Sequence, residues 1–415
     1  MNLIRKALAV RDVLAERKRL RGPAELQYAI ADRIGMLDAA TWNSLTESAG
    51  FFMSRGYLQA LEGVLPANIQ PRYALISDAA HRPVAAVCMQ LADIGVGQVR
   101  KKRKEPAPEA NPCAALEKLA GKVSQRVLTC GNLLSYGQHG VAFAPDFPEE
   151  TIWHGVAEVL YRVRMADKLR GTTHFVLIKD VHEPFQKGAS SLEKLSYRYV
   201  KTEPNMVLAL DSTWKSHDDY LASLSSKYRA GIRNNVLKPI EQAGCTVALL
   251  PEIDSLQARV HDLYRAVQNN ADFRPYELRP EYFPALLQAA GDRLRCSGIR
   301  RGDELLGFLI TLADGETAFA YHIGFDREAA AGLPVYLRLL HAGIADAIAL
   351  GCSRVSFGRT ALEPKAALGA KPETFGVMLR HRQPVLNTLI KRLLLCVEHD
   401  EPPDRNPFKT APKAG

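Results

Sequence analysis

The stretch ADAIALGCSRVSFGR, residues 345–359, decides the fold, because its pattern is that of a helix, a glycine stop and a strand. Gly351 stands where the residue after a helix takes a left-handed conformation that glycine adopts freely. A second stretch of the same design, ADKLRGTTHFVLIKD, occupies residues 166–180, with Gly171 at the matching place. The recurrence predicts two copies of one α/β unit.

A second pair of stretches supports the duplication. Residues 77–93, SDAAHRPVAAVCMQLAD, and residues 300–314, RRGDELLGFLITLAD, both have the pattern of a strand, a polar turn and a strand. Both end in Leu-Ala-Asp. The spacing between the copies is far too long for a solenoid repeat, so two homologous domains are expected.

Short apolar runs alternate with amphipathic stretches along the chain, which predicts an α/β (or α+β) fold class. The longest single elements expected are a helix over 216–242 and strands over 197–210 and 373–381. We divide the 415 residues as follows: an N-terminal segment 1–24, a first domain 25–204 with a basic, Pro-rich loop at 100–126, a second domain 205–400, and a tail 401–415.

The composition favours anionic partners. The formal net charge is +9 and the pI about 9.1, which suits nucleic acid, acidic headgroups or phosphorylated small molecules. The seven cysteines and 11 histidines show no metal-ligand spacing, so we expect no metal and reduced thiols in a cytoplasmic protein. No apolar run approaches the ~20 residues of a membrane span, and the first residues lack the apolar core of a secretory signal.

Two basic segments stand out. Residues 1–21, MNLIRKALAVRDVLAERKRLR, carry seven basic and two acidic side chains, with apolar residues at helical spacing. Such a helix lies on an anionic membrane surface or docks on its own domain. The run RKKRK at 100–104 contacts nucleic acid or lipid, or is simply solvated.

The second half resembles a known family. Four stretches carry the resemblance: SSKYRAGIRNNVLKPIEQAGCTVALL (225–250), FRPYELRPEYFPALLQ (273–288), AFAYHIGFD (318–326) with LPVYLRLLHAGIADAIALGCSRVSFGR (333–359), and LEPKAALGAK (362–371). Their order and spacing resemble those of FemAB-like acyltransferases of the GNAT superfamily of N-acetyltransferases. The resemblance is good over about 205–385 and weaker over about 30–200.

The resemblance implies two tandem GNAT-like domains, each a twisted mixed β-sheet flanked by helices. It also implies transfer of an acyl group to an amine, without a metal or a covalent enzyme intermediate. The donor in this family is an acyl-CoA, such as acetyl-CoA, or an aminoacyl-tRNA.

The family pattern also implies catalytic residues. It places a lysine in a Phe-Lys-x-x-Phe-Gly-like element, and Lys365 occupies that position, with Gly369 following. Pro364 and Leu368 stand where the family prefers aromatic residues. Glu363 is expected to pair with Lys365 or to act as a base, and Arg359, at the end of the preceding strand, to bind substrate.

The strand AYHIGF supplies further candidates. Its backbone N–H groups are the expected oxyanion donors. Tyr321 and His322 alternate on it, so only one is expected to face a cleft. Histidine would accept the amine proton, and tyrosine would protonate the leaving group.

The phosphate cradle is expected at a helix start, where free N–H groups favour an anion. The candidates in AAAGLPVYLRLL are Gly332, Leu333, Pro334 and Val335. The loop DREAAAGLP lacks the Arg/Gln-x-x-Gly-x-Gly/Ala pattern of CoA-binding relatives, which leaves room for an aminoacyl-tRNA donor or a decayed site. The matching loop of the first half, SYGQHGVAFAPDFPEE, also lacks it and begins its helix with two glutamates, so we place the chemistry in the second half.

Three basic residues lie beside an apolar stripe on the helix expected over 216–242. Arg229 and Arg233 are candidates for a phosphate or carboxylate contact, and Lys227, across the stripe, is a weaker one.

The sequence thus leaves three functions open. The first is an N-acyltransferase that uses acyl-CoA on an amine of a small molecule or cell-envelope precursor. The second is an aminoacyl-tRNA-dependent aminoacyltransferase of the peptidoglycan type, and the third is a degenerate, non-catalytic binding protein. We expect a cytoplasmic protein with at most peripheral membrane contact, tRNA as the one nucleic-acid partner to test, and no DNA.

Overall fold

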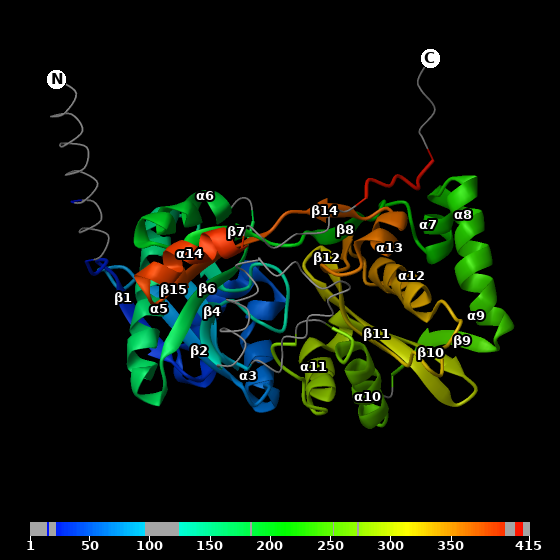
Figure 1. Ribbon diagram of the computed structural model, residues 1–415, viewed down its shortest axis with the longest axis horizontal. Coiled ribbons are helices and arrows are strands. Elements are labelled where there is room, and N and C mark those ends of the chain that lie inside the picture. Colours follow the sequence, from blue (N-terminus) through cyan, green and yellow to red (C-terminus); the bar gives the residue numbers. More distant parts are fainter. Residues whose placement is uncertain are drawn as a thin grey trace, which may run out of the picture.

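The computed structural model describes residues 15, 22–95, 124–182, 185–251, 253–271, 274–394 and 403–409. Two mixed β-sheets stand side by side, each flanked by helices (Figure 1). The predicted fold class is confirmed. The N-terminal segment 1–21, the basic run 100–104 and most of the loop 100–126 lie outside the described residues.

The first sheet has the strand order β1-β2-β3-β4-β6-β15-β7, and β5 pairs with β3. Its strands are β1 Gln27–Ala31, β2 Ile69–Ser77, β3 Pro83–Ile94, β4 Gln125–Cys130, β5 Val141–Phe143, β6 Thr173–Val181, β7 Arg198–Lys201 and β15 Gly376–His381.

The second sheet has the order β14-β8-β13-β12-β11-β10-β9. Its strands are β8 Asn205–Ala209, β9 Cys245–Leu249, β10 Leu294–Arg301, β11 Glu304–Asp314, β12 Thr317–Phe325, β13 Arg354–Ser356 and β14 Lys371–Glu373.

The two sheets have the same design. Each has one parallel pair in its middle, β4 with β6 and β12 with β13, among antiparallel neighbours. Each parallel pair is joined through a long helix, α5 or α12. The repeat that the sequence predicts is therefore visible in the topology.

The helices of the first half are α2 Ala39–Thr46, α3 Arg55–Val64, α5 Glu149–Ala166 and α6 Phe185–Ala189. Those that follow are α7 His217–Ser223, α8 Ser226–Ile232, α9 Lys238–Gln242, α10 Gln257–Gln268, α11 Tyr282–Ala290, α12 Val335–Ala349, α13 Leu362–Ala367 and α14 Pro384–Leu394.

One strand from the second half joins the first sheet, which the sequence did not predict. The strand expected over 197–210 divides into β7 of the first sheet and β8 of the second. The strand expected over 373–381 divides likewise into β14 and β15, so a C-terminal strand completes the first sheet. The domain bounds remain a prediction, but β15 lies in the first sheet although the sequence assigns it to 205–400.

The single helix expected over 216–242 is also divided. A capping box at Ser216 starts α7, and Leu224 breaks the helix in an extended conformation. After α8 the chain makes a π-helical turn, Arg233–Leu237, before α9. The turn ends two residues before Pro239, which cannot donate a backbone hydrogen bond, so the interruption has a local cause.

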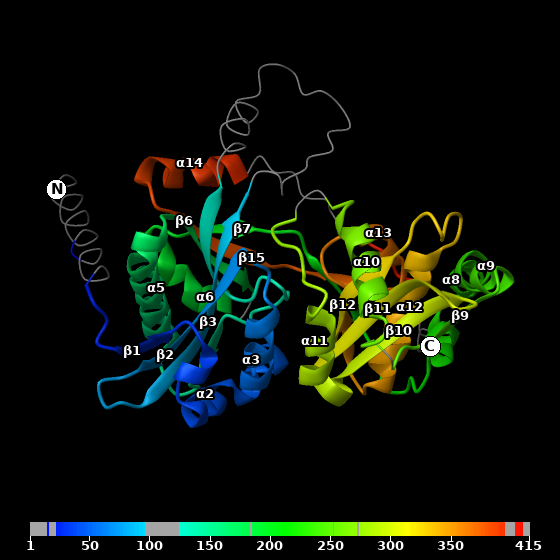
Figure 2. The ribbon, with the colours of Figure 1, turned by 90° about the horizontal axis from the view of Figure 1, so that it is seen from below.

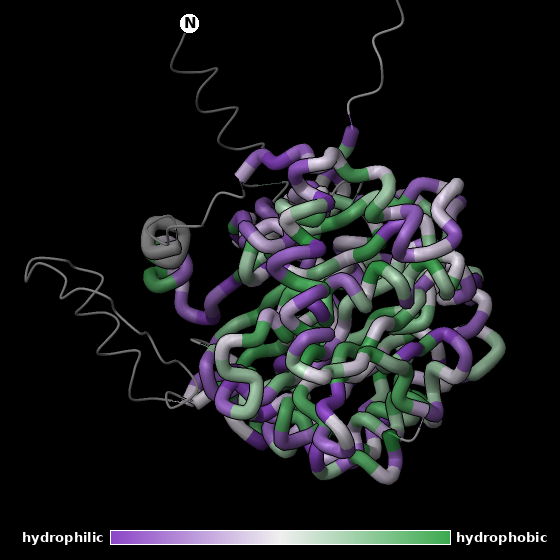
Figure 3. The backbone as a smooth tube through the Cα atoms, turned by 90° about the vertical axis from the view of Figure 1, so that its right-hand side faces the viewer, coloured by the Kyte–Doolittle hydropathy of each residue, from purple (hydrophilic) through white to green (hydrophobic). Residues whose placement is uncertain are grey.

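One hydrophobic core joins the halves. Trp42, Phe52 and Tyr57 of the first half pack in one buried cluster with Tyr282 and Phe308 of the second. Helices α3 and α11 lie against each other at this boundary, where Figure 2 shows them facing one another. Figure 3 shows the longest hydrophobic stretches in the middle of the molecule, with hydrophilic ones toward the outside.

Candidate functional site

The parallel strands β12 and β13 separate after a short pairing. They pair at Thr317–Arg354, Ala318–Val355 and Phe319–Ser356, and β12 then continues to Phe325 without β13. A β-bulge in β12, opposite Ile310 and Thr311, bends the strand at this point. The separation leaves backbone groups of β12 unpaired by the sheet, which makes them available to a substrate.

A cavity of about 370 Å³, which we call the Lys365 cavity, opens beside this separation. It is lined by Ala320, Ile323, Phe325, Arg327, Tyr336 and Lys365, among others. These residues come from β12, the turn that follows it, the start of α12 and α13.

The Lys365 amine is buried in that cavity wall. Only 2% of the residue is exposed, and Nζ donates a hydrogen bond of 3.2 Å to the Gly358 carbonyl. Burial lowers the pKa of Lys365 to about 7, against a smaller opposing effect of Glu203. A substantial fraction of this amine is therefore neutral near pH 7.

The turn that aims Lys365 inward is strained. Ala361, just before α13, has a φ of 53°, a left-handed conformation that costs energy in any residue but glycine. Gly358, with a φ of 78°, makes the preceding turn. Strain of this kind is often stored where a functional group must be held in place.

The predicted phosphate cradle lies next to the same cavity. Gly332 has a φ of 77° with open space where a side chain would stand, and the first turn of α12 carries no acidic residue. Pro334 caps the helix rather than starting its first turn, and Val335 is buried in the core, where Leu333 packs against its cluster. The sequence missed Arg327, which lines the cavity with its guanidinium 5.7 Å from the Phe325 ring centre.

Tyr321 and His322 lie on the face of β12 that is turned away from the Lys365 cavity. The alternation expected for them is wrong, because the bulge brings both side chains to one side. The Tyr282 hydroxyl contacts the Tyr321 hydroxyl at 3.1 Å and His322 Nε2 at 3.1 Å, and Tyr57 completes the network. Burial lowers the pKa of His322 to about 3. A direct catalytic role for the pair stays a prediction, and packing accounts for their contacts.

Glu363 and Arg359 do not meet Lys365. The Glu363 carboxylate accepts hydrogen bonds from Arg405, at 3.1 Å from Nε, on the exposed side of α13. Arg359 reaches across to the first half, where it pairs with Asp180. The pairing of Glu363 with Lys365 that the sequence suggests is therefore wrong.

The three basic residues of α8 and the following turn lie outside the Lys365 cavity lining. Arg229 donates a weak hydrogen bond of 3.4 Å to the Ala222 carbonyl, and Arg233 is exposed. Lys227 lines an apolar groove with Gly231 and Glu363. Anion binding by these residues stays a prediction.

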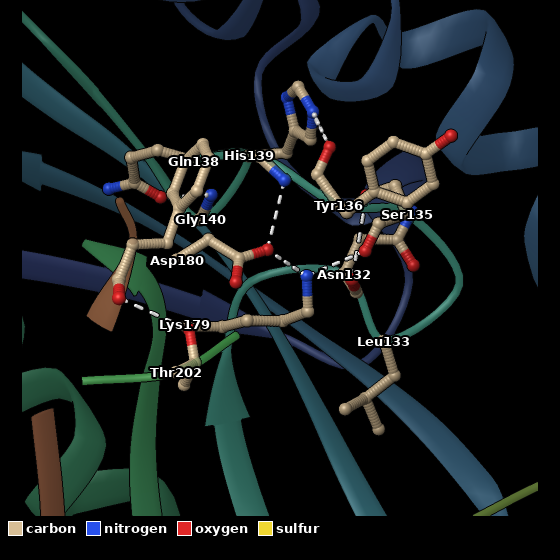
Figure 4. Close-up of polar contacts among 12 residues, drawn as sticks. Asn132, Leu133, Ser135, Tyr136, Gln138, His139, Gly140, Lys179, Asp180 and Thr202 are labelled. Atoms are coloured by element: carbon tan, nitrogen blue, oxygen red, sulfur yellow. Dashed lines mark hydrogen bonds and ion pairs between the residues drawn. The ribbon is translucent and has the colours of Figure 1, made fainter. Parts of the chain in front are cut away.

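A larger cavity, about 780 Å³, lies between the halves, and we call it the interface cavity. The first half contributes the loop with Tyr136, Gln138 and His139, and the second half contributes Phe319, Arg354 and Ser356. Figure 4 shows the loop residues around Lys179 and Asp180.

A buried ion cluster holds that loop. The Asp180 carboxylate pairs with Lys179 and with Arg359 of the other half, and it accepts a hydrogen bond of 2.9 Å from the Gly137 backbone. Burial raises the pKa of Asp180, but the two cations outweigh it and the net shift is downward. Asp180 also has a left-handed φ of 56°, so the chain is strained here as well.

Several buried polar atoms around the interface cavity have no partner. They are Gln138 Nε2, His139 Nδ1, Arg354 Nε and, beside the ion cluster, Arg359 Nε. Leaving such groups unsatisfied is costly, so their gathering around one cavity indicates a polar ligand. The sequence missed these first-half residues, because only the fold brings them to the second sheet; the quoted loop SYGQHG was the available signal.

Tyr136 connects the two halves at the separation of β12 and β13. Its hydroxyl donates to the Ala320 carbonyl at 2.8 Å and lies 3.4 Å from the Ser356 carbonyl. Ala320 also lines the Lys365 cavity, while Tyr136 lines the interface cavity. The two cavities therefore lie on either side of the separated strands, with the Tyr136 hydroxyl between them.

Comparison with known proteins identifies the second half. Residues 226–366 match the family described as "Acetyltransferase (GNAT) domain". This part of the chain is a GNAT domain. No curated protein matches the sequence.

Two solved structures share the fold of nearly the whole chain. FemX is 10% identical with a TM-score of 0.51, and the match covers 88% of this chain and 100% of FemX. A tandem GNAT protein from the clavulanic acid biosynthesis pathway is 12% identical with a TM-score of 0.51, covering 87% and 99%. The predicted tandem fold is confirmed: the chain has two GNAT-like domains, and residues 226–366 of the second match a GNAT acetyltransferase domain.

The described part of the chain has neither a metal-binding cluster nor a helix that could span a membrane. There, no three His, Cys, Asp or Glu side chains are grouped to hold a metal ion. None of the helices described is both long and apolar enough to cross a bilayer. The five cysteines among these residues are buried and form no disulfide.

Proposed function

We propose that this protein transfers an acyl group from acyl-CoA to an amine, with the donor in the Lys365 cavity and the acceptor in the interface cavity. One observation carries the proposal: the two cavities flank the point where β12 and β13 separate, and one of them is lined by a buried lysine whose pKa is close to 7. The acceptor class is an amine of a small molecule or a cell-envelope precursor.

The donor side fits a thioester with an anionic carrier. Free backbone N–H groups at the start of α12 and the Arg327 guanidinium are suited to phosphate. The apolar walls at Ile323, Phe325 and Tyr336 suit the acyl portion. Unpaired backbone N–H groups of β12 beyond Phe319 would stabilise the oxyanion.

The acceptor side fits a polar amine. Glu373, which pairs with Arg354 at 2.9 Å, supplies a carboxylate on the cavity wall for a cationic amine to approach. The unpartnered nitrogens of His139 and Arg354 are available to other polar groups of the acceptor. Burial lowers the pKa of His139 to about 4, so this ring is neutral and does not repel the amine.

In the reaction, the neutral amine nitrogen attacks the thioester carbonyl carbon, the new C–N bond forms and the C–S bond breaks. The amine must lose one proton and the leaving thiolate must gain one. Neutral Lys365 accepts the proton from the amine, and its protonated form returns it to the thiolate, so no net proton stays on the enzyme. No covalent enzyme intermediate is required.

A second donor class is an aminoacyl-tRNA. The observation that favours it is the loop DREAAAGLP, which lacks the glycine pattern of CoA-binding relatives, together with the net charge of +9. In that case the same carbonyl attack releases a tRNA hydroxyl. A peptidoglycan-type acceptor belongs to this alternative.

The remaining sequence predictions accompany these proposals. We place the protein in the cytoplasm, with possible substrates at the membrane surface reached through residues 1–21. A non-catalytic binding role is the third alternative.

The test is donor turnover by the purified full-length chain. Thiol release from acetyl-CoA is measured with a panel of amines, in parallel with deacylation of charged tRNA. Turnover of acetyl-CoA that requires an amine and is lost in Lys365→Met supports the first proposal. Turnover of charged tRNA alone supports the second, and turnover of neither donor, with no thermal shift by either, leaves the binding role.

A further inference from the structure

We propose that the surface at one end of strands β6 and β15 of the first sheet is a docking surface for an anionic lipid bilayer. The edge patch, as we call it, consists of the second half of α5, the 3₁₀ turn Asp167–Arg170 that follows it, and the start of α14. The proposal is independent of the transfer reaction, because these elements line neither cavity described above.

Large apolar side chains are exposed along this patch. Leu169 is 99% exposed and Val385 73%, followed by Tyr161 at 51%, Met165 at 44% and Leu389 at 38%. Helix α5 presents Tyr161 and Met165 four residues apart, the 3₁₀ turn that continues it presents Leu169, and α14 presents Val385 and Leu389 four residues apart. Residues four apart share one helix face, so each helix carries an apolar stripe toward solvent.

The two stripes lie at the same end of the neighbouring strands β6 and β15. Strand β15 ends at His381, opposite Phe175 near the start of β6, and the Arg382 backbone donates 2.9 Å to the His174 carbonyl. Because β6 follows the turn Asp167–Arg170, α14 begins where that turn ends. Figure 2 shows α14 lying across this end of the strands above the upper end of α5.

Positive charge surrounds the stripes. Residues 158–170 and 380–389 together contain six Arg and Lys side chains and only two carboxylates, Glu158 and Asp167. Glu158 is already paired with Arg162, and Asp167 with the buried Arg72. The pKa of Arg164 is lowered by burial and by its neighbours Arg380 and Arg382, so these arginines stand close together.

Aliphatic stripes inside a basic rim match an anionic bilayer, in which apolar side chains enter the headgroup boundary and arginines meet acidic headgroups. Nucleic acid offers phosphates and base faces, and Leu169 or Val385 gains little from either. Residue 24 lies beside the patch, since the Ala24 backbone donates a hydrogen bond to Glu158, and residues 1–21 before it carry seven basic side chains. An anionic bilayer would attract both the edge patch and this basic N-terminal segment.

The test is co-sedimentation of the full-length chain with vesicles. One set contains phosphatidylcholine alone, and the other about one-third phosphatidylglycerol. We expect binding to the anionic set only, and a loss of roughly tenfold or more in the partition coefficient for the double variant Leu169→Glu, Val385→Glu. Arg170→Gln with Arg382→Gln should lose about fivefold per arginine.

The matched control is Met36→Glu with Leu249→Glu, which replaces exposed apolar residues elsewhere on the molecule. It should bind vesicles as the unaltered chain does, and all variants should keep their melting temperature because the positions are exposed. Failure to bind anionic vesicles, equal binding to neutral ones, or unchanged binding of the Leu169, Val385 variant would overturn the proposal. Loss of tRNA binding in that variant, with vesicle binding intact, would instead make the patch a nucleic-acid surface.

Discussion

The two halves build the same sheet but end their central strand pair differently. In the first half, β4 pairs with β6 at five positions up to its last residue, Cys130. In the second half, β12 pairs with β13 at three positions and then runs on alone. The chain after β4 instead forms the loop with Tyr136, which reaches the other half. One copy of the fold thus opens to substrate, and the other supplies a wall.

The helices next to the two parallel strand pairs, β4 with β6 and β12 with β13, also differ between the halves. The helix α12 starts without an acidic residue, whereas α5 starts with Glu149 and Glu150, which oppose an anion. After β13, α13 carries the buried Lys365; after β6, α6 carries the exposed Lys187. Electrostatics and burial together favour our proposal that the donor binds in the second half.

The largest expected effect comes from removing the buried amine. Lys365→Met should lower kcat by about 10²- to 10⁴-fold, the usual contribution of a proton-transfer group. Lys187→Met, the matched lysine of the first half, should leave kcat unchanged. Steady-state donor turnover measures both, and equal losses in the two variants would remove the distinction between the halves.

The same lysine should make stability depend on pH. Its pKa is lowered from 10.5 to about 7 in the folded state, so between these pH values the unfolded chain holds more protons. The free energy of unfolding should rise with pH in this window, and the penalty is complete below pH 7. Lys365→Met should therefore stabilise the protein by up to a few kcal/mol near pH 6, and by less near pH 10. Denaturant titrations at both pH values would show a constant difference if Lys365 were solvated.

The link between the halves is tested by Asp180→Asn, which keeps the shape and tolerates the left-handed backbone. It leaves Lys179 and Arg359 buried without their counter-charge, at a cost of about 3 kcal/mol. Urea unfolding measures it. Because the pKa of Asp180 is lowered in the fold, its contribution is lost as pH falls through that folded pKa. A cost near zero would mean that the cluster does not hold the halves.

A smaller effect is expected from Tyr136→Phe, which removes only the hydroxyl between the separated strands. The loss of one buried hydrogen bond costs about 1 kcal/mol of stability. If the hydroxyl also orients the Ala320 carbonyl at the reacting centre, kcat/KM falls by roughly tenfold more than stability loss explains. Measured at a temperature where both proteins are folded, an unchanged kcat/KM would limit Tyr136 to packing.

The smallest effect should come from Arg229→Gln with Arg233→Gln. Both positions lie outside the two cavity linings, so we expect the KM for the donor to change less than about twofold. An increase of tenfold or more would restore the anion contact that the sequence suggests and would extend the donor site to α8.

Many helices and strands of this molecule can be predicted from its sequence, because local physical signals determine them. Helix stops at Gly171 and Gly351 and apolar periodicity are local signals, and they predict the repeated elements well. The placement of β15 in the first sheet, between β6 and β7, depends on the three-dimensional arrangement of the halves, which no local pattern contains. The bulge that turns Tyr321 and His322 to one face is likewise invisible to a rule of alternation.

The candidate site divides in the same way. Lys365 and Gly332 follow from motif position; Lys365 lines the Lys365 cavity, and Gly332 precedes by four residues Tyr336, which also lines it. Tyr136 and His139 precede Gly332 by almost two hundred residues in the sequence, and they join the site only because the two halves pack together. Glu363 is only two residues from Lys365 in sequence, yet side chains two positions apart in a helix point to different sides.

The central claim is that Lys365 is a buried, nearly neutral amine in the donor site of the second half. Trace labelling of the folded protein with an amine-reactive reagent from about pH 5 to pH 11, read by mass spectrometry, measures this for each lysine. We predict that Lys365 titrates near pH 7, and that saturating acetyl-CoA or charged tRNA protects Lys365 from labelling but not the exposed Lys187. Titration of Lys365 near the ordinary lysine value of about 10.4, or equal labelling with and without both donors, would contradict the account.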